Sequence, residues 1–278
     1  MIFAKYIFSY KFIIIMSIRL AVFSLGGTIV DRYSLSPYIS LRQAFQKKGL
    51  NIPNKLIYKY MGIEKHQHIT EILNDKYISR QWMQIHGEYP NINSTISVFD
   101  EFIKYQMTEG IKNIEILPET KSCIKWLGDH NISTGVTTEF SRPIMNAIRE
   151  KLIDDDIHID KWVSSTCLGK PGRPNPHMMR EIMYSLGIHN NPRRVIKIDD
   201  SIIGINEGKN AGAITIGVAK WSSNMLMTDY DEDKKLSKKE YYKRLKISRE
   251  ILWSASPDYV INSLNELPKI IYHLNNRN

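Results

Sequence analysis

Two patterns of apolar and polar residues divide the chain. From about residue 114 onwards, short apolar runs alternate with segments in which apolar residues recur every three or four positions. The first kind of segment is typical of a buried strand and the second of an amphipathic helix. The expected strands comprise residues 132–137, 162–164, 195–198, 214–218 and 259–261, after an earlier one at 20–23. Repeated strand–helix units predict an α/β fold in which helices flank a parallel sheet.

Residues 38 to about 112 differ, because helical spacing continues almost throughout and no convincing strand interrupts it. Turn-forming clusters at 51–54 and 89–91 separate the expected helices. We therefore expect an all-helical cap inserted into the α/β fold. The expected division is an N-terminal extension at 1–17, a Rossmann-like core of residues 18–36 and 113–278, and the helical cap at 37–112.

The first 15 residues are aromatic and apolar, but Lys5 and Lys11 interrupt them. No uninterrupted apolar stretch reaches the length of a membrane helix. Cleavage of a signal peptide after the next apolar run would remove part of the strand at 20–23. We therefore expect no membrane partner, with Met16 as an alternative start and a membrane tether by residues 1–15 as the minor alternative.

Composition adds few constraints, since the proportions of apolar and charged residues, 42% and 24%, are those of an ordinary globular protein. The two cysteines exclude a disulfide scaffold and a four-cysteine zinc site, which indicates a reducing, cytoplasmic setting. Lys and Arg number 38 against 29 Asp and Glu, a formal charge of +9. The densest basic run, between Lys234 and Arg249, is interpreted as a solvated helical face rather than a phosphate-backbone patch, so no nucleic acid is expected.

Polar residues and glycines follow three of the expected strands. Ser24-Leu25-Gly26-Gly27-Thr28 follows the first strand, Thr138 follows another, and Asp199-Asp200 ends a third. In parallel sheets the ligand site lies beyond the carboxyl ends of the strands. We therefore expect these residues to meet at one edge of the sheet.

The order of these three strand ends resembles the haloacid dehalogenase superfamily. Three further motifs are similar to those of the phosphonoacetaldehyde hydrolase family: MGIEKHQHI at 61–69, GRPNPHM at 172–178, and KIDD at 197–200 leading into GINEGKNAG at 204–212. The resemblance extends from about residue 18 to the C-terminus. It implies hydrolysis of the C–P bond of phosphonoacetaldehyde to acetaldehyde and phosphate.

The resemblance assigns the central role to Lys65, whose amine would form a Schiff base with the aldehyde. The resulting iminium accepts the charge left on carbon when the C–P bond breaks. Imine formation needs a neutral amine, so the pKa of Lys65 must be lowered by burial or nearby positive charge. His68, one helical turn further on, would transfer protons or order water.

The same resemblance implies the binding groups. The catalytic set is Lys65, Ser24, His68 and Thr138, and the substrate-binding set is Arg173, Gly62, Met61 and Thr138. Magnesium would be held by Asp200, the main-chain carbonyl of Gly26 and Ser24. The expected partners are a small phosphonate or phosphate ligand and a second copy of the chain in a homodimer.

Ser24 stands where the family carries a nucleophilic Asp, and Glu139 follows Thr138 where the family usually has Gly. A serine hydroxyl is a weak nucleophile without an adjacent base. Glu139 would be unfavourable for an anionic ligand if it pointed inward. The alternatives that follow are a hydrolase slowed by Ser24, a catalytically inactive homologue that binds a phosphorylated or aldehyde ligand or a protein partner, and a phosphatase acting on phosphate esters.

Overall fold

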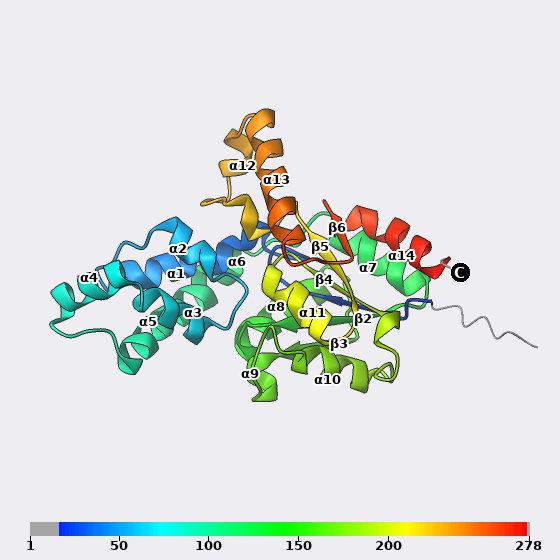
Figure 1. Ribbon diagram of the computed structural model, residues 1–278, viewed down its shortest axis with the longest axis horizontal. Coiled ribbons are helices and arrows are strands. Elements are labelled where there is room, and N and C mark those ends of the chain that lie inside the picture. The colour runs from blue at the N-terminus through cyan, green and yellow to red at the C-terminus, as the bar shows by residue number, and fades with distance from the viewer. Residues whose placement is uncertain (1–16, 277–278) are drawn as a thin grey trace, which may run out of the picture.

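The computed structural model describes residues 17–276, in which a six-stranded parallel sheet carries helices on both faces (Figure 1). The strands are β1 (Leu20–Phe23), β2 (Ser133–Thr138), β3 (Lys161–Ser164), β4 (Val195–Asp199), β5 (Ile214–Val218) and β6 (Tyr259–Ile261). Their order is β3-β2-β1-β4-β5-β6, so β1 lies between β2 and β4 where the strand order reverses. This confirms the predicted α/β fold, and it places the switch point at the carboxyl end of β1.

The helices of the core follow the strands in sequence. They are α7 (Thr120–Asp129), α8 (Arg142–Asp154), α9 (Ser165–Leu168), α10 (His177–Ser185), α11 (Ile202–Asn210), α12 (Glu232–Lys235), α13 (Lys238–Trp253) and α14 (Leu267–Asn275). Short 3-10 turns lie at η1 (Arg32–Ser34), η3 (Pro192–Arg194), η4 (Ser223–Met225) and η5 (Leu264–Glu266).

Strand β1 shows why both faces of the sheet are covered. Ala21 and Phe23 pack into the apolar cluster formed with α7, α8 and α14, whereas Leu20 and Val22 pack against α10 on the opposite face. Successive side chains of a strand point to opposite faces, so a run of four apolar residues requires helices on both sides. All four side chains are buried.

The helical unit, on the left in Figure 1, comprises α1 (Leu35–Lys47), α2 (Asn54–Lys59), α3 (Lys65–Leu73), α4 (Lys76–His86), α5 (Ile92–Tyr105), the π-turn η2 (Gln106–Gly110) and α6 (Ile111–Asn113). Helices α1 to α5 share one apolar cluster, which Trp221, Met225 and Met227 of the segment after β5 also join. The apolar cluster of the inserted helices therefore extends onto the core, close to the carboxyl edge of the sheet.

The basic run is divided between α12 and α13, which project at the top of Figure 1. Several of its cations pair with neighbouring carboxylates, for example Lys243 with Glu240 and Lys246 with Glu250. These exposed pairs are those of a solvated helical face. Among residues 17–276, no helix has the length and apolar character needed to cross a bilayer.

Candidate active site

A cavity of about 60 Å³ opens at the carboxyl edge of the sheet, between the sheet and the inserted helices. A water molecule needs roughly 10–15 Å³ measured this way, so the cavity has room for a small organic ligand. Of the residues that the sequence singles out, all but His68 line it: Ser24, Gly26, Met61, Gly62, Lys65, Thr138, Arg173 and Asp200.

Ser24 occupies the position directly after β1. Its backbone N–H donates to the Ile198 carbonyl at 3.0 Å, which extends the pairing of β1 with β4. Its Oγ accepts a hydrogen bond from Arg173 Nη1 at 3.2 Å, and the residue is 6% exposed. Within the described part of the chain no histidine lines the cavity. The hydroxyl is thus oriented by a cation and has no imidazole beside it.

Lys65 is the first residue of α3 and is 7% exposed. Its Nζ donates to the Ile63 carbonyl at 3.2 Å. Burial lowers the pKa of Lys65 to about 8; Glu139 and Glu64 oppose this shift, and Arg173 adds to it. An amine with this pKa is substantially neutral near pH 8, as imine formation requires.

Gly62 brings the Lys65 segment close to the core. Its φ of +96° lies in the left-handed region, and a Cβ there would be 3.1 Å from Ser201 Oγ, just before α11. Any larger residue would be strained and would push the two segments apart. The glycine therefore allows the inserted helices to approach the edge of the sheet.

His68 does not reach the cavity. Its side chain is fully buried, its Nε2 lies 2.9 Å from the Ile57 carbonyl, and its ring meets Tyr60 edge-on. Burial and the charge of Lys65 lower the pKa of His68 well below its usual value, so the imidazole is neutral and Nε2 donates to Ile57. The structure places His68 as a packing group that connects α3 to α2, rather than at the position expected for proton transfer to a ligand.

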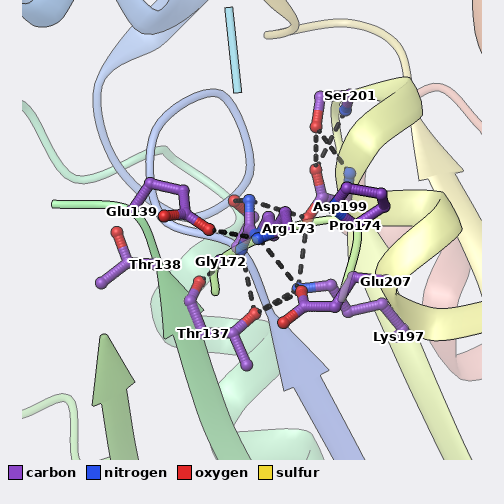
Figure 2. A network of polar contacts seen from close by, with 12 residues as sticks. Thr137, Thr138, Glu139, Gly172, Arg173, Pro174, Lys197, Asp199, Ser201 and Glu207 are labelled. Atoms are coloured by element: carbon purple, nitrogen blue, oxygen red, sulfur yellow. Dashed lines mark hydrogen bonds and ion pairs between the residues drawn. The ribbon is translucent and has the colours of Figure 1, made fainter. Parts of the chain in front are cut away.

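Arg173 is buried and its guanidinium is almost fully used by the protein (Figure 2). Nε donates to Glu207 at 3.1 Å, and Nη2 donates to the Thr137 carbonyl at 2.5 Å and to Thr137 Oγ1 at 2.9 Å. Nη1 contacts Ser24 Oγ and lies 3.4 Å from Asp199 Oδ2. Arg173 lines the cavity, but its main contacts orient Ser24 and connect the strands, so substrate binding by Arg173 stays a prediction.

Sequence reasoning missed a buried network below the cavity, formed by Lys197, Glu207 and Asp199 together with Arg173 (Figure 2). Lys197 Nζ lies 3.2 Å from Asp199 Oδ2 and 3.1 Å from Glu207 Oε2. Two cations and two anions thus compensate one another without solvent, and loss of any one would leave an unpaired buried charge. The available signal was Lys197 itself, a charged residue within an otherwise apolar strand.

Asp200 lines the cavity and has few compensating contacts. Its Oδ1 accepts from Thr28 Oγ1 at 3.3 Å, and burial together with Asp199 raises the pKa of Asp200 to about 8. Gly27, with φ of +70°, packs on the carboxylate so closely that a Cβ would be 2.4 Å from Oδ2. Within residues 17–276 no three His, Cys, Asp or Glu side chains gather as a metal cluster. A buried carboxylate with so few groups to balance its charge nonetheless fits a site for a hard cation. The other groups that coordinate such a cation would be main-chain carbonyl, hydroxyl and substrate oxygens.

Glu139 points inward and is satisfied by two donors. Its Oε1 accepts from the Arg173 backbone N–H at 2.7 Å, and its Oε2 accepts from Ser165 Oγ at 2.6 Å. Thr138, beside it, accepts at Oγ1 from the Phe140 backbone N–H at 3.1 Å. The sequence predicted that an inward-pointing Glu139 would be unfavourable for an anionic ligand, but it did not reveal the two hydrogen-bond donors of its carboxylate.

The Asp199 carboxylate occupies the space next to Gly204 at the start of α11. A Cβ at Gly204 would be 1.9 Å from Asp199 Oδ2. We expect Gly204→Ala to lower the free energy of unfolding by about 2–3 kcal/mol, because the charged network cannot shift without losing its partners.

Gly128→Ala is the matched control for this change, since it also adds a methyl group in a helix but has nothing within 4 Å of the added atom. It should stabilise the protein by up to about 1 kcal/mol. Urea unfolding of the two variants measures the difference, and equal midpoints would contradict the crowding at Asp199.

Comparisons with known proteins show which family and which relatives this chain resembles. Residues 21–218 match the haloacid dehalogenase-like hydrolase family. A protein named phosphonoacetaldehyde hydrolase from Latilactobacillus sakei subsp. sakei (strain 23K) is 28% identical over 254 residues, which are 91% of this chain and 95% of that protein. Its namesake from Paraburkholderia phytofirmans (strain DSM 17436 / LMG 22146 / PsJN) is 28% identical over 94% of this chain and 96% of its own length.

Among solved structures, a phosphonoacetaldehyde hydrolase-like protein from Oleispira antarctica superimposes with a TM-score of 0.87 at 24% identity. The match covers 94% of this chain and 93% of that one. A β-phosphoglucomutase from Clostridium difficile matches with a TM-score of 0.64 at 21% identity, over 93% of this chain and 97% of its own. Both likenesses concern the fold, including the helical unit beside the sheet.

Proposed function

Because this chain belongs to the haloacid dehalogenase-like hydrolase family, we propose that it binds phosphonoacetaldehyde as an imine of Lys65 and hydrolyses its C–P bond. The observation that carries the proposal is a buried lysine of lowered pKa that lines the same cavity as Ser24 and Asp200. The names of the relatives from Latilactobacillus and Paraburkholderia support the choice of substrate.

The reaction begins with the neutral amine of Lys65 attacking the aldehyde carbon. Loss of water then gives a neutral imine, in which the C=N bond replaces the C=O bond, and uptake of one proton at the imine nitrogen gives the cationic iminium. The cavity supports this step because Lys65 lines it and only 7% of the residue is exposed. Exclusion of bulk water keeps the iminium from returning to the aldehyde too early.

When the C–P bond breaks, its electron pair moves into the iminium and produces a neutral enamine. The phosphoryl group passes either to Ser24 Oγ, with loss of the hydroxyl proton, or directly to a water molecule. On the first route, water then hydrolyses the phosphate ester of Ser24, which releases phosphate and restores the hydroxyl. Protonation of the enamine carbon gives the iminium of acetaldehyde, and hydrolysis of this iminium releases acetaldehyde and restores Lys65. Arg173 holds the Ser24 hydroxyl at this end of the cavity, at 3.2 Å.

We propose magnesium as the cofactor, because within residues 17–276 the buried Asp200 carboxylate forms no ion pair and only the more distant charge of Arg173 acts on it. Asp200, the Gly26 carbonyl and the Ser24 hydroxyl would hold it. Bound there, the ion would offset the charge of the phosphonate.

A second candidate function is retention of the ligand without turnover. The observation in its favour is that Arg173 donates to Ser24 Oγ, and an oxygen that accepts from a cation is a poorer nucleophile. On this reading, Lys65 captures the aldehyde and phosphate is not released.

Two measurements distinguish the candidates. Borohydride reduction in the presence of phosphonoacetaldehyde should attach the ligand to Lys65 under both. Phosphate release with repeated turnover, measured with magnesium present, supports the hydrolase, whereas trapping with no phosphate above the level of a Lys65→Arg control supports the binding protein. Absence of trapping rejects both.

The dependence of trapping on pH provides a further prediction. The trapped fraction at short times should rise with pH through a midpoint near 8, since deprotonation of Lys65 produces the reactive amine. Peptide mass spectrometry across a pH series measures it. A midpoint near the ordinary lysine value, about 10.4, would show that the amine is not buried in solution.

We also propose that the protein forms a homodimer through its inserted helices. Large apolar side chains are exposed on α4 and α5 and in the segment between them, namely Tyr77, Ile85, Tyr89 and Ile92. Exposed apolar surface of this kind is typical of an interface. Sedimentation equilibrium of the wild type and of an Ile92→Lys variant tests it, and a monomeric wild type would overturn it.

A further inference from the structure

Glu139 forms part of the wall of the cavity. It follows β2 directly, is 8% exposed, and lines the cavity together with Arg173 and Lys65. Its carboxylate is fixed by the Arg173 backbone N–H at 2.7 Å and by Ser165 Oγ at 2.6 Å. A Cβ at Gly172 would be 2.5 Å from both carboxylate oxygens, so the Gly172 backbone packs directly on the carboxylate (Figure 2).

Glu139 also shares a second cavity with Lys65. This smaller cavity is lined by Lys65, Glu64 and Glu139, so the two carboxylates share these surroundings with the lysine. Of the two, Glu139 acts more strongly on the charge of Lys65. In the described chain neither carboxylate forms an ion pair with Lys65 within 4 Å. Their charges therefore act on the amine through space, where little solvent screens them.

We infer that Glu139 is a positioning residue: it holds the Arg173 main chain at one end of the cavity and keeps a fixed negative charge beside the Lys65 amine at the other. This inference rests on the proposed imine chemistry and deepens it. An iminium is cationic, so a preorganised carboxylate beside it stabilises that intermediate relative to the neutral imine. The same charge favours a ligand whose carbonyl end is uncharged, and it disfavours aldehydes that carry a second anionic group there.

The direction of the effect follows from the groups around Lys65. Burial and Arg173 lower the pKa of the amine, whereas Glu139 and Glu64 raise it. His68, on the same helix, is neutral and adds no charge. Asp200 is the other carboxylate that lines the cavity. Removing the charge of Glu139 alone should therefore leave Lys65 less readily protonated.

Glu139→Gln tests the charge with little change of shape. The amide oxygen can accept from the Arg173 N–H, and the amide nitrogen can donate to Ser165 Oγ. The probe is acetaldehyde with cyanoborohydride, which ethylates neutral Lys65 and requires no C–P cleavage. Peptide mass spectrometry follows the modification of Lys65 between about pH 6 and pH 10. We expect the midpoint of Glu139→Gln to lie about 0.5–1 pH unit below that of the wild type.

Two control variants separate charge from structure. Ser165→Ala removes one hydrogen bond to Glu139 but keeps the charge, so its midpoint should stay within about 0.2 pH units of the wild type. Glu139→Asp also keeps the charge, so its midpoint should lie closer to that of the wild type than to that of Glu139→Gln. An unchanged or raised midpoint in a folded Glu139→Gln overturns the inference, as does a wild type in which Lys65 is never modified.

If Glu139→Gln does not fold, the pair Ser165→Ala and Glu139→Asp carries the test, and a fall in the Glu139→Asp midpoint as large as that expected for Gln contradicts the role of charge. Because acetaldehyde lacks phosphorus, a wild type that releases no phosphate from phosphonoacetaldehyde would reject only the proposed hydrolysis. The two failures are therefore distinguishable.

Discussion

Ser24→Asp should increase phosphate release from phosphonoacetaldehyde by about 100-fold or more, which corresponds to a lowering of the activation barrier by about 2.7 kcal/mol. A carboxylate is charged at neutral pH, attacks phosphorus without needing a base, and is a better ligand for magnesium than a hydroxyl. Arg173 Nη1 already lies 3.2 Å from Ser24 Oγ and would pair with the new carboxylate. Initial rates of phosphate release with saturating magnesium measure the gain.

Ser24→Asn is the matched control, because it has the shape of Asp but no charge, and it should not raise the rate. A second readout checks the metal. The new carboxylate would be buried next to Asp200, so Ser24→Asp should be destabilised without magnesium and should recover thermal stability when magnesium is added. No gain in rate from a folded Ser24→Asp would show that the cavity lacks more than a nucleophile.

Lys65→Arg should abolish both imine trapping and phosphate release, with a loss of at least about 1000-fold in any measured rate. A guanidinium remains protonated at all accessible pH values, so it cannot condense with an aldehyde. The positive charge at the position is retained, which keeps the electrostatic surroundings of Glu139 and Arg173 close to those of the wild type. Parallel assays of trapped ligand and released phosphate measure the loss.

Lys76→Arg is the matched control for Lys65→Arg. Lys76 is likewise the first residue of an inserted helix, α4, but its side chain is exposed. It should retain wild-type rates and add no trapped ligand. If Lys65→Arg kept trapping while Lys76→Arg lost it, the Schiff base would have to be assigned elsewhere in the inserted helices.

The sequence predicted the sheet well because its strands are short apolar runs that end in polar residues. Strands β1, β5 and β6 have the expected bounds, and β2, β3 and β4 differ by one residue at one or both ends. The starts of the helices depend on more than this pattern. α11 begins at Ile202, two residues before the motif at 204–212, because Ser201 Oγ accepts from the Gly204 backbone N–H and caps the helix there. Side-chain caps of this kind depend on local geometry that glycine spacing does not reveal.

His68 and Arg173 show where sequence reasoning reached its limit. Both were expected to face a ligand, yet His68 turns to the Ile57 carbonyl and Arg173 is engaged by Glu207, Thr137 and Asp199. A motif gives the spacing of residues along a helix or loop, but the direction of a side chain depends on which partners the rest of the chain brings near. For Arg173 the nearest of those partners in sequence, Asp199, is 26 positions away.

By itself the sequence determined the parallel sheet, the helical insert and the set of strand ends at which Ser24, Thr138 and Asp200 lie, because strand period and strand termination are local properties. Only the tertiary structure decided that Lys65 reaches the same cavity, that Glu139 faces it, and that Lys197 belongs to a buried charge network. Those facts depend on contacts between residues far apart along the chain. The charge interactions among these residues are strong because the residues are buried, and they become buried only when the helices and the sheet pack together.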